Sequence, residues 1–90
     1  MLKIQITKRV CKFLMRLPRK QSLQLKVKLQ ELQASPFPHN SKVLIGYSNY
    51  YRVSVGEYRI VYRVENNILL VPLIGKRNDD EVYKKLKQIL

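Results

Sequence analysis

Apolar positions divide the first part of the chain into a short strand and a helix. Leu2, Ile4 and Ile6 alternate with polar residues, which is typical of a half-buried strand. The apolar residues that follow recur at the i, i+3, i+4, i+7 spacing of one helical stripe, and they are Val10, Phe13, Leu14 and Leu17. Thr7 is a suitable N-cap for this helix, and Pro18 marks its end.

The segment from Arg19 to Ala34 has an ambiguous pattern. Part of it alternates like a strand, but it is about three times the usual strand length and rich in good helix formers. We therefore predict a helix. One apolar side of this helix consists of Leu25, Leu29 and Leu32, and a second, nearly opposite, consists of Leu23, Val27 and Ala34. Such a helix has two surfaces to bury, and only one of them needs to pack within this chain.

The second half of the chain has the pattern of a β-sheet. Prolines and small polar residues indicate a loop over residues 35–41. Strands are predicted over Lys42 to Ile45, Tyr51 to Val55, Tyr58 to Glu65 and Ile68 to Ile74, with turns at Gly56-Glu57 and Asn66-Asn67. The last strand is apolar enough for an inner position, although Pro72 lacks a backbone donor. Asn78 or Asp79 then caps a final helix.

These elements predict an α+β fold in a single small domain over residues 1–90. The order is β-α-α-β-β-β(-β)-α, and we expect a mainly antiparallel, twisted sheet packed against the helices. In the hairpin formed by the second and third strands of this half, side chains alternate between the two faces of the sheet. If Val53 and Ile60 face the core, then Arg52, Arg59 and Arg63 share the other face.

Charge favours a polyanionic partner. The chain has 18 Lys and Arg against 6 Asp and Glu, a net charge of +12, whereas solubility alone usually needs a magnitude of roughly 2 to 8. Nucleic acid is the first candidate, and an anionic membrane surface or an acidic protein is the second. A solvated, arginine-rich sheet face remains the plain alternative.

The same counts exclude several kinds of chemistry. With one His and one Cys the chain has too few ligands for a zinc site, and the six acids offer little for a magnesium site or a paired-carboxylate hydrolase. We expect no metal and no cofactor. The first ten residues contain no unbroken apolar stretch, so no secretory signal is predicted, and neither is a membrane span. A cytoplasmic location is therefore expected.

Four short motifs carry a resemblance to a known family. They are Tyr51-Arg52-Val53-Ser54-Val55, Tyr58-Arg59-Ile60-Val61-Tyr62, Gly75-Lys76-Arg77 and Glu81-Val82-Tyr83. Together with the order of elements, they resemble the RelE toxins of bacterial toxin–antitoxin pairs and imply a RelE-like fold. The hairpin motif is shared across the RelE/ParE superfamily. The last two motifs are more similar to the RelE branch, which cuts mRNA in the ribosomal A site, than to the gyrase-poisoning ParE branch.

The resemblance implies a set of site residues. It places catalytic arginines at Arg59 and Arg77, a catalytic tyrosine at Tyr83, and a substrate-binding cation at Arg52. A second substrate-binding lysine of the family corresponds to Ser54. Other cations that can replace its charge are Lys42, Arg63 and Lys76. Arg63 can instead be a solvated strand residue, and Tyr83 has the spacing of a residue that packs with Leu86 and Leu90.

The implied function is the toxin of a type II toxin–antitoxin system. It would be a ribosome-dependent, metal-independent endoribonuclease, an mRNA interferase that inhibits translation by 2′-hydroxyl attack within A-site codons. Arginines suit this reaction because their planar, permanently charged groups match phosphate oxygens. The implied partners are a RelB-like antitoxin, the ribosome with its mRNA, and operator DNA through the antitoxin complex only. The alternatives are a ParE-like toxin that inhibits gyrase by binding, and a general nucleic-acid-binding module.

Overall fold

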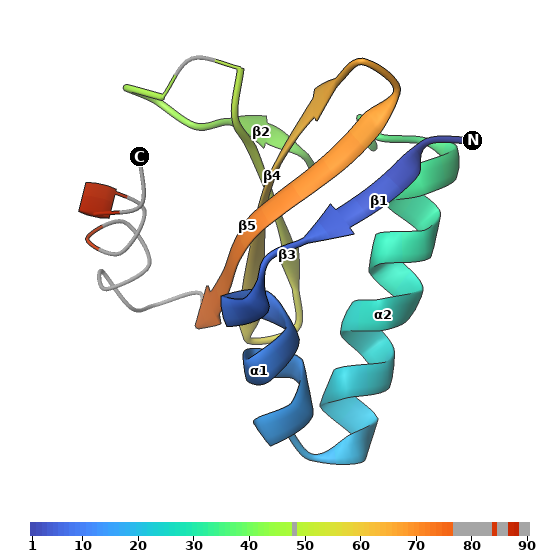
Figure 1. Ribbon diagram of the computed structural model, residues 1–90, viewed down its shortest axis with the longest axis vertical. Helices are drawn as coiled ribbons and strands as arrows, with labels where there is room; N and C mark the ends of the chain where they lie inside the picture. Colours follow the sequence, from blue (N-terminus) through green and yellow to red (C-terminus); the bar gives the residue numbers. More distant parts are fainter. Residues whose placement is uncertain (48, 77–83, 85–86, 89–90) are drawn as a thin grey trace.

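The computed structural model describes residues 1–47, 49–76, 84 and 87–88 of the chain. This part contains two helices and five strands (Figure 1). They are β1 (Lys3–Ile6), α1 (Lys8–Arg16), α2 (Arg19–Ala34), β2 (Lys42–Val43), β3 (Tyr51–Val55), β4 (Tyr58–Glu65) and β5 (Ile68–Lys76). The predicted α+β fold is confirmed. The predicted final helix begins at Asn78 or Asp79, which lie outside the described residues.

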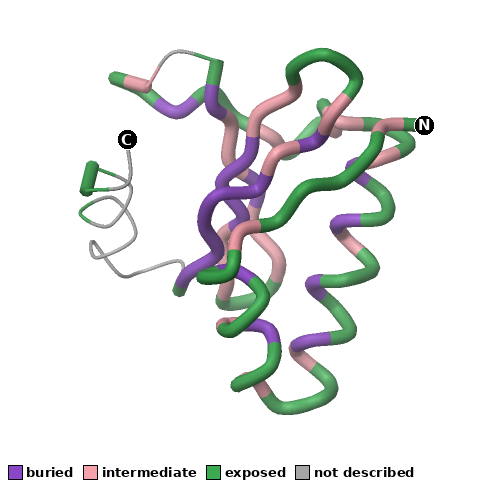
Figure 2. The backbone as a smooth tube through the Cα atoms, viewed as in Figure 1, coloured by how far each residue is buried: buried purple, intermediate pink, exposed green. Residues whose placement is uncertain are grey.

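The five strands form one sheet in the order β1-β5-β4-β3-β2. β1 runs parallel to β5, and the other three neighbouring pairs are antiparallel, so the expected mainly antiparallel sheet is confirmed. The main core lies between the two helices and one face of the sheet, where buried segments of helix and strand meet (Figure 2). Its buried members are Val10, Leu14, Leu25, Leu29, Leu32, Val53, Ile60, Tyr62, Leu69, Val71 and Ile74.

Helix α1 begins at the predicted N-cap. The hydroxyl of Thr7 accepts a hydrogen bond from the Val10 amide at 3.2 Å and donates one to the carbonyl of Pro72, also at 3.2 Å. The cap therefore satisfies a free amide of the first turn and ties the start of the helix to β5. Val10 and Leu14 of the predicted stripe are buried, which confirms that this side of α1 faces the core.

The prediction of a half-buried first strand is wrong. All four residues of β1 are exposed, with Ile4 at 39% and Ile6 at 37% of full exposure. β1 is an edge strand whose neighbour in the sheet is β5. Leu2, just before β1, packs against the main core and is partly buried. The alternating pattern correctly identified the strand. Whether its apolar residues are buried depends on which helices cover the sheet there, and the pattern gives no information on that.

The structure confirms that residues Arg19–Ala34 form a helix and that this helix has two apolar sides in different environments. Leu25, Leu29 and Leu32 are buried in the core. On the other side of the helix, Leu23 retains 48% and Val27 51% of their full exposure. The second apolar side of α2 therefore faces outward in the described part of the structure.

The two predicted turns between the last three strands have left-handed backbone angles. Gly56 has φ of 57°, while Asn66 and Asn67 have φ of 51° and 63°. Glycine and asparagine are the residues that adopt such angles most readily. β2 ends at Val43, two residues earlier than predicted, because the chain turns back at Leu44, whose amide donates to the carbonyl of Tyr50.

β5 is an inner strand, as predicted, and most of its residues are buried. Val61 lies opposite Leu73, and Arg63 lies opposite Leu70, so one residue of β4 faces two residues of β5 at this point. Pro72 lies in this β-bulge, where a missing backbone donor is tolerated. The bulge explains how a proline fits within an inner strand.

A basic sheet face as the candidate functional site

The sheet has a second face, opposite the main core, on which the predicted cations gather. Strand alternation places on this face the residues that we call the basic face, namely Lys42, Arg52, Ser54, Arg59 and Arg63. Val53 and Ile60, the neighbours of these residues along the strands, are buried in the core. The predicted sharing of one surface by Arg52, Arg59 and Arg63 therefore follows from the strand register.

The cations lie in rows that cross the strands. Lys42 of β2 is directly opposite Arg52 of β3. In the next row, Arg59 of β4 lies between Ser54 of β3 and Gly75 of β5. Residues opposite one another in a sheet have Cβ atoms only about 4.5–5.5 Å apart. Both neighbours of Arg59 across the strands are therefore small residues.

Electrostatics distinguishes this face from an ordinary solvated surface. Like charges placed directly opposite in a sheet destabilise it, and Lys42 with Arg52 is such a pair. Among the described residues, the one acidic side chain on β3 and β4 that can offset these charges is Glu65, at the far end of β4. An anion bound between Lys42 and Arg52 would relieve the repulsion between them.

Arg63 makes contacts that the sequence did not predict. Its guanidinium forms an ion pair with Glu65, and its Cζ lies 5.5 Å from the centre of the Tyr50 ring. Hydrogen bonds to Tyr50 and to Glu65 raise the pKa of this guanidinium above its usual value. Strand alternation places Arg63 and Glu65 on the same face, so the pair was detectable in the sequence, whereas the contact with Tyr50 was not.

A small apolar cluster lies on the same side of the sheet as the basic face. Its buried members are Leu44, Tyr50, Val61 and Leu73, and Tyr47 packs against them. Tyr50 packs, because it retains 7% of its full exposure. Tyr47 is only half-buried.

Three predicted site residues are not brought to this face by the described part of the structure. Lys76 lies opposite Tyr58, whose ring packs against Phe13 of α1, so its register position belongs to the helix side of the sheet. Arg77 and Tyr83 lie outside the described residues. Their assignment to the site remains a prediction from the resemblance.

Two absences apply to the part of the chain that the structure describes. It contains no group of three or more His, Cys, Asp or Glu side chains that could hold a metal ion. Nor does any of its helices have the length and apolar character needed to cross a membrane.

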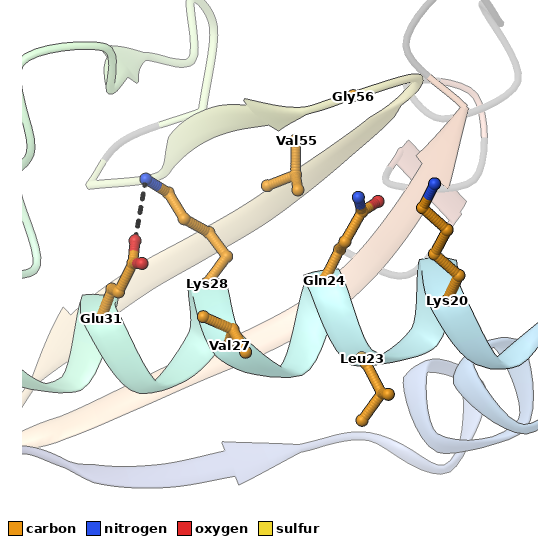
Figure 3. Close-up of a pocket in the computed structure, with 8 residues that line it drawn as sticks. All are labelled: Lys20, Leu23, Gln24, Val27, Lys28, Glu31, Val55 and Gly56. Atoms are coloured by element: carbon orange, nitrogen blue, oxygen red, sulfur yellow. Dashed lines mark ion pairs between the residues drawn. The ribbon is translucent and has the colours of Figure 1, made fainter.

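A separate groove runs between α2 and the turn that joins β3 to β4. It encloses about 540 Å³ and is lined by Lys20, Leu23, Gln24, Val27, Lys28, Glu31, Val55 and Gly56. In Figure 3, Lys20 and Gln24 point toward the turn, and Lys28 forms an ion pair with Glu31 at 3.5 Å. Leu23 and Val27, on the outward side of α2, give the groove an exposed apolar margin.

Comparisons with known proteins identify the family. The family model for the ParE toxin of the type II toxin–antitoxin system parDE matches residues 4–81, whereas no curated protein matches the chain. The isolated E. coli RelE toxin is 30% identical over 100% of both chains, with a TM-score of 0.75. A doubly substituted E. coli RelE in the free state is 30% identical with a TM-score of 0.79, covering 99% of this chain and 98% of that one. A chain of the intact E. coli RelBE toxin–antitoxin complex is 27% identical with a TM-score of 0.74, covering 88% of this chain and 100% of that one. The chain therefore belongs to the RelE/ParE superfamily and is the toxin of a type II toxin–antitoxin system.

Proposed function

We propose that this toxin is a ribosome-dependent endoribonuclease that cleaves mRNA in the A site. The observation that carries the proposal is the placement of like charges on the basic face, where Lys42 lies opposite Arg52 and Arg59 lies between two small residues. Folding alone does not favour such a row, because it reduces stability. A bound phosphate backbone would neutralise these cations and remove the repulsion between them.

The proposed reaction is attack of a ribose 2′-hydroxyl on the adjacent phosphate. The attacking oxygen forms a bond to phosphorus, the bond to the 5′-oxygen breaks, and the products are a 2′,3′-cyclic phosphate and a 5′-hydroxyl. Arg59 stabilises the extra negative charge on the phosphate oxygens, and Arg77 stabilises the leaving oxygen. Tyr83, in the role that the resemblance implies, takes the proton of the 2′-hydroxyl as a phenolate, and the leaving 5′-oxygen takes up a proton from water. No metal or organic cofactor is needed for these steps.

The ribosome supplies the geometry in this proposal. In-line attack requires the 2′-oxygen, the phosphorus and the leaving oxygen to be aligned, and such positioning can contribute roughly 7–11 kcal/mol in favourable cases. The basic face offers cations but no dedicated acid among the described residues. Free RNA should therefore be cut poorly, and RNA held in the A site should be cut efficiently.

Single-turnover cleavage on programmed ribosomes tests the proposal. Tyr83→Phe should slow cleavage by about 10² to 10⁴, the usual contribution of a general acid or base. Tyr58→Phe is the matched control, because Tyr58 packs against Phe13 on the helix side of the sheet. Arg59→Lys and Arg77→Lys keep the charge but lose the planar group, so they should impair cleavage more than binding. Cleavage by Tyr83→Phe at the parent rate would remove this residue from the mechanism.

A ParE-like toxin that inhibits gyrase by binding is the second candidate. The match of residues 4–81 to the ParE family model favours it. Primer extension on a translated message after induction separates the two functions. Cuts within codons support the nuclease, whereas intact messages together with arrested replication support the inhibitor.

We also propose that a cognate antitoxin silences this toxin in the cytoplasm, and that operator DNA is bound through their complex. Structures with RelB antitoxins are known for RelE proteins similar in fold to this chain, including one from Pyrococcus horikoshii OT3 at 24% identity with a TM-score of 0.76. The groove beside α2 suits an acidic, amphipathic segment, because it combines exposed Leu23 and Val27 with Lys20 at its edge. The toxin's net charge of +12 favours such a partner.

Co-expression with the cognate antitoxin, followed by affinity measurement, tests the groove. Leu23→Glu and Val27→Glu should each weaken the complex by about tenfold or more, because a carboxylate would replace an apolar contact within an acidic partner's footprint. Met15→Glu is the matched control, since Met15 is 79% exposed on α1 and does not line the groove. Equal losses in all three variants, or none, would place the antitoxin elsewhere.

A further inference from the structure

The turn over residues 44–50 joins β2 to β3 at the edge of the basic face (Figure 1). The structure describes residues 44–47 and 49–50 of this turn. Among them, three backbone hydrogen bonds run from Leu44 to the Tyr50 carbonyl at 2.9 Å, and from Tyr47 to the Leu44 carbonyl and Tyr50 to the Tyr47 carbonyl, both at 3.2 Å. Gly46 and Asn49 have left-handed backbone angles, at φ of 87° and 67°. These bonds tie the two ends of the turn together.

Side chains fix this turn to the sheet. Tyr50 and Leu44 are buried on Val61 and Leu73 of the inner strands. The guanidinium of Arg63 lies over the Tyr50 ring, as a cation over an aromatic face, and Glu65 forms an ion pair with the same guanidinium. We call Tyr50, Arg63 and Glu65 the clamp.

The position of the clamp links it to the cations. Tyr51 lies opposite Tyr62, so the preceding residue, Tyr50, lies beside Arg63 in the register. The turn continues directly from β2, whose Lys42 lies opposite Arg52. The turn also carries Tyr47, whose half-buried ring packs against the apolar cluster.

We propose that the clamp fixes the turn over residues 44–50 as one wall of the RNA-binding face, so that Arg63 is a positioning residue and not a phosphate ligand. This inference rests on the proposed function, because it assigns Arg63 a role in the binding of ribosome-held RNA. It also revises the expectation that Arg63 replaces the missing family lysine at Ser54. An arginine that already bonds a carboxylate and a tyrosine has fewer donors left for a phosphate.

The two roles of Arg63 predict different salt dependences. A phosphate ligand contributes about 0.7–0.9 to the slope of log affinity against log salt concentration, because its contact releases a counterion. Loss of a positioning residue weakens binding without reducing that slope. Substitution of Glu65 separates the two roles further. If Arg63 is a phosphate ligand, removal of the Glu65 carboxylate frees its guanidinium and should strengthen RNA binding. If Arg63 acts through the clamp, the same removal should weaken RNA binding.

The experiment measures affinity for ribosomes programmed with an mRNA whose A-site riboses carry 2′-O-methyl groups, which prevents cleavage, over a series of salt concentrations. Arg63→Gln and Tyr50→Leu should each reduce affinity by about fivefold with an unchanged salt slope, and together by little more than either alone. Glu65→Gln should also weaken binding. Arg52→Gln is the control with the same loss of charge, and its slope should fall by about 0.7–0.9.

Amide hydrogen exchange of the same variants gives a second readout. Exchange at Leu44 and Tyr50 should accelerate in Arg63→Gln and in Glu65→Gln, while exchange in the buried part of β4 should stay at the parent rate. A reduced salt slope in Arg63→Gln, or tighter binding by Glu65→Gln, would overturn the positioning role alone. A parent protein that does not bind ribosomes at any salt concentration would overturn the proposed function, and the positioning role with it.

Discussion

Lys42 offers a test in which stability and function should change in opposite directions. It lies directly opposite Arg52 at the edge of the sheet, and the two positive side chains repel each other in the free protein. Lys42→Gln keeps a side chain of similar length and removes the repulsion. The variant should therefore be slightly more stable than the parent and bind programmed ribosomes less tightly.

The magnitudes follow from geometry and exposure. Like charges directly opposite in a sheet cost about 0.2–1 kcal/mol, and Lys42 is exposed, so the lower part of that range applies. A gain of about 0.3 kcal/mol corresponds to a rise in melting temperature of about 1–2 °C for a domain of this size. Loss of one phosphate contact should lower the slope of log affinity against log salt by about 0.7–0.9.

Thermal unfolding at about 10 mM and 150 mM ionic strength, with ribosome binding over the same range, measures both effects. The gain in melting temperature should be larger at low ionic strength than at the higher one, because the screening length falls from about 30 Å to about 8 Å. Lys26→Gln on α2 is the control, since this exposed lysine has no cation opposite it on a strand. A less stable Lys42→Gln protein, or an unchanged salt slope, would refute the reasoning.

Three further predictions concern the core, the site and a helix cap. Tyr62→Phe removes the hydroxyl that donates to the Pro36 carbonyl at 2.6 Å and should cost about 1 kcal/mol in chemical denaturation. Because burial raises the pKa of Tyr62, its contribution is complete below about pH 10 and declines at higher pH, so the stability difference between parent and variant should shrink there. Ser54→Lys restores the family's second cation beside Arg59, and it should increase the salt slope of ribosome binding by about 0.7–0.9 while lowering the melting temperature by a few degrees. Thr7→Ala should destabilise the protein by about 1 kcal/mol, measured by urea denaturation, and an unchanged midpoint would show that the cap contributes nothing.

Local patterns predicted most of the fold. The bounds of α2, β3 and β4 match the prediction, because helix propensity, strand alternation and turn residues all agree in these segments. The prediction of where β2 ends was wrong, since the turn at Leu44 is set by contacts with strands far away in the sequence. The prediction that β1 is half-buried was wrong for a similar reason, because the burial of an edge strand depends on which other elements cover it.

The site was predicted less completely than the fold. Alternation alone placed Arg52, Arg59 and Arg63 on one face, and the register confirms this. Alternation also places Glu65 on the side of Arg63, but it could not predict the contact of Arg63 with Tyr50, since that contact depends on how the turn before β3 folds over the sheet. Nor could it place Gly75 beside Arg59, because the bulge in β5 shifts the register by one residue at that point.

The bulge at Pro72 decides which side chain stands next to Arg59. Before the bulge, Leu69 and Val71 of β5 point into the main core, and after it Ile74 does so while Leu73 and Gly75 lie on the opposite face. If β5 ran past Pro72 in regular register, without the bulge, Ile74 would lie opposite Arg59 and Gly75 would turn toward the core. The extra residue of the bulge therefore keeps a branched side chain away from Arg59 and places a glycine there instead. A proline that looks like a defect in an inner strand thus sets which residue borders the arginine that we propose acts on the phosphate.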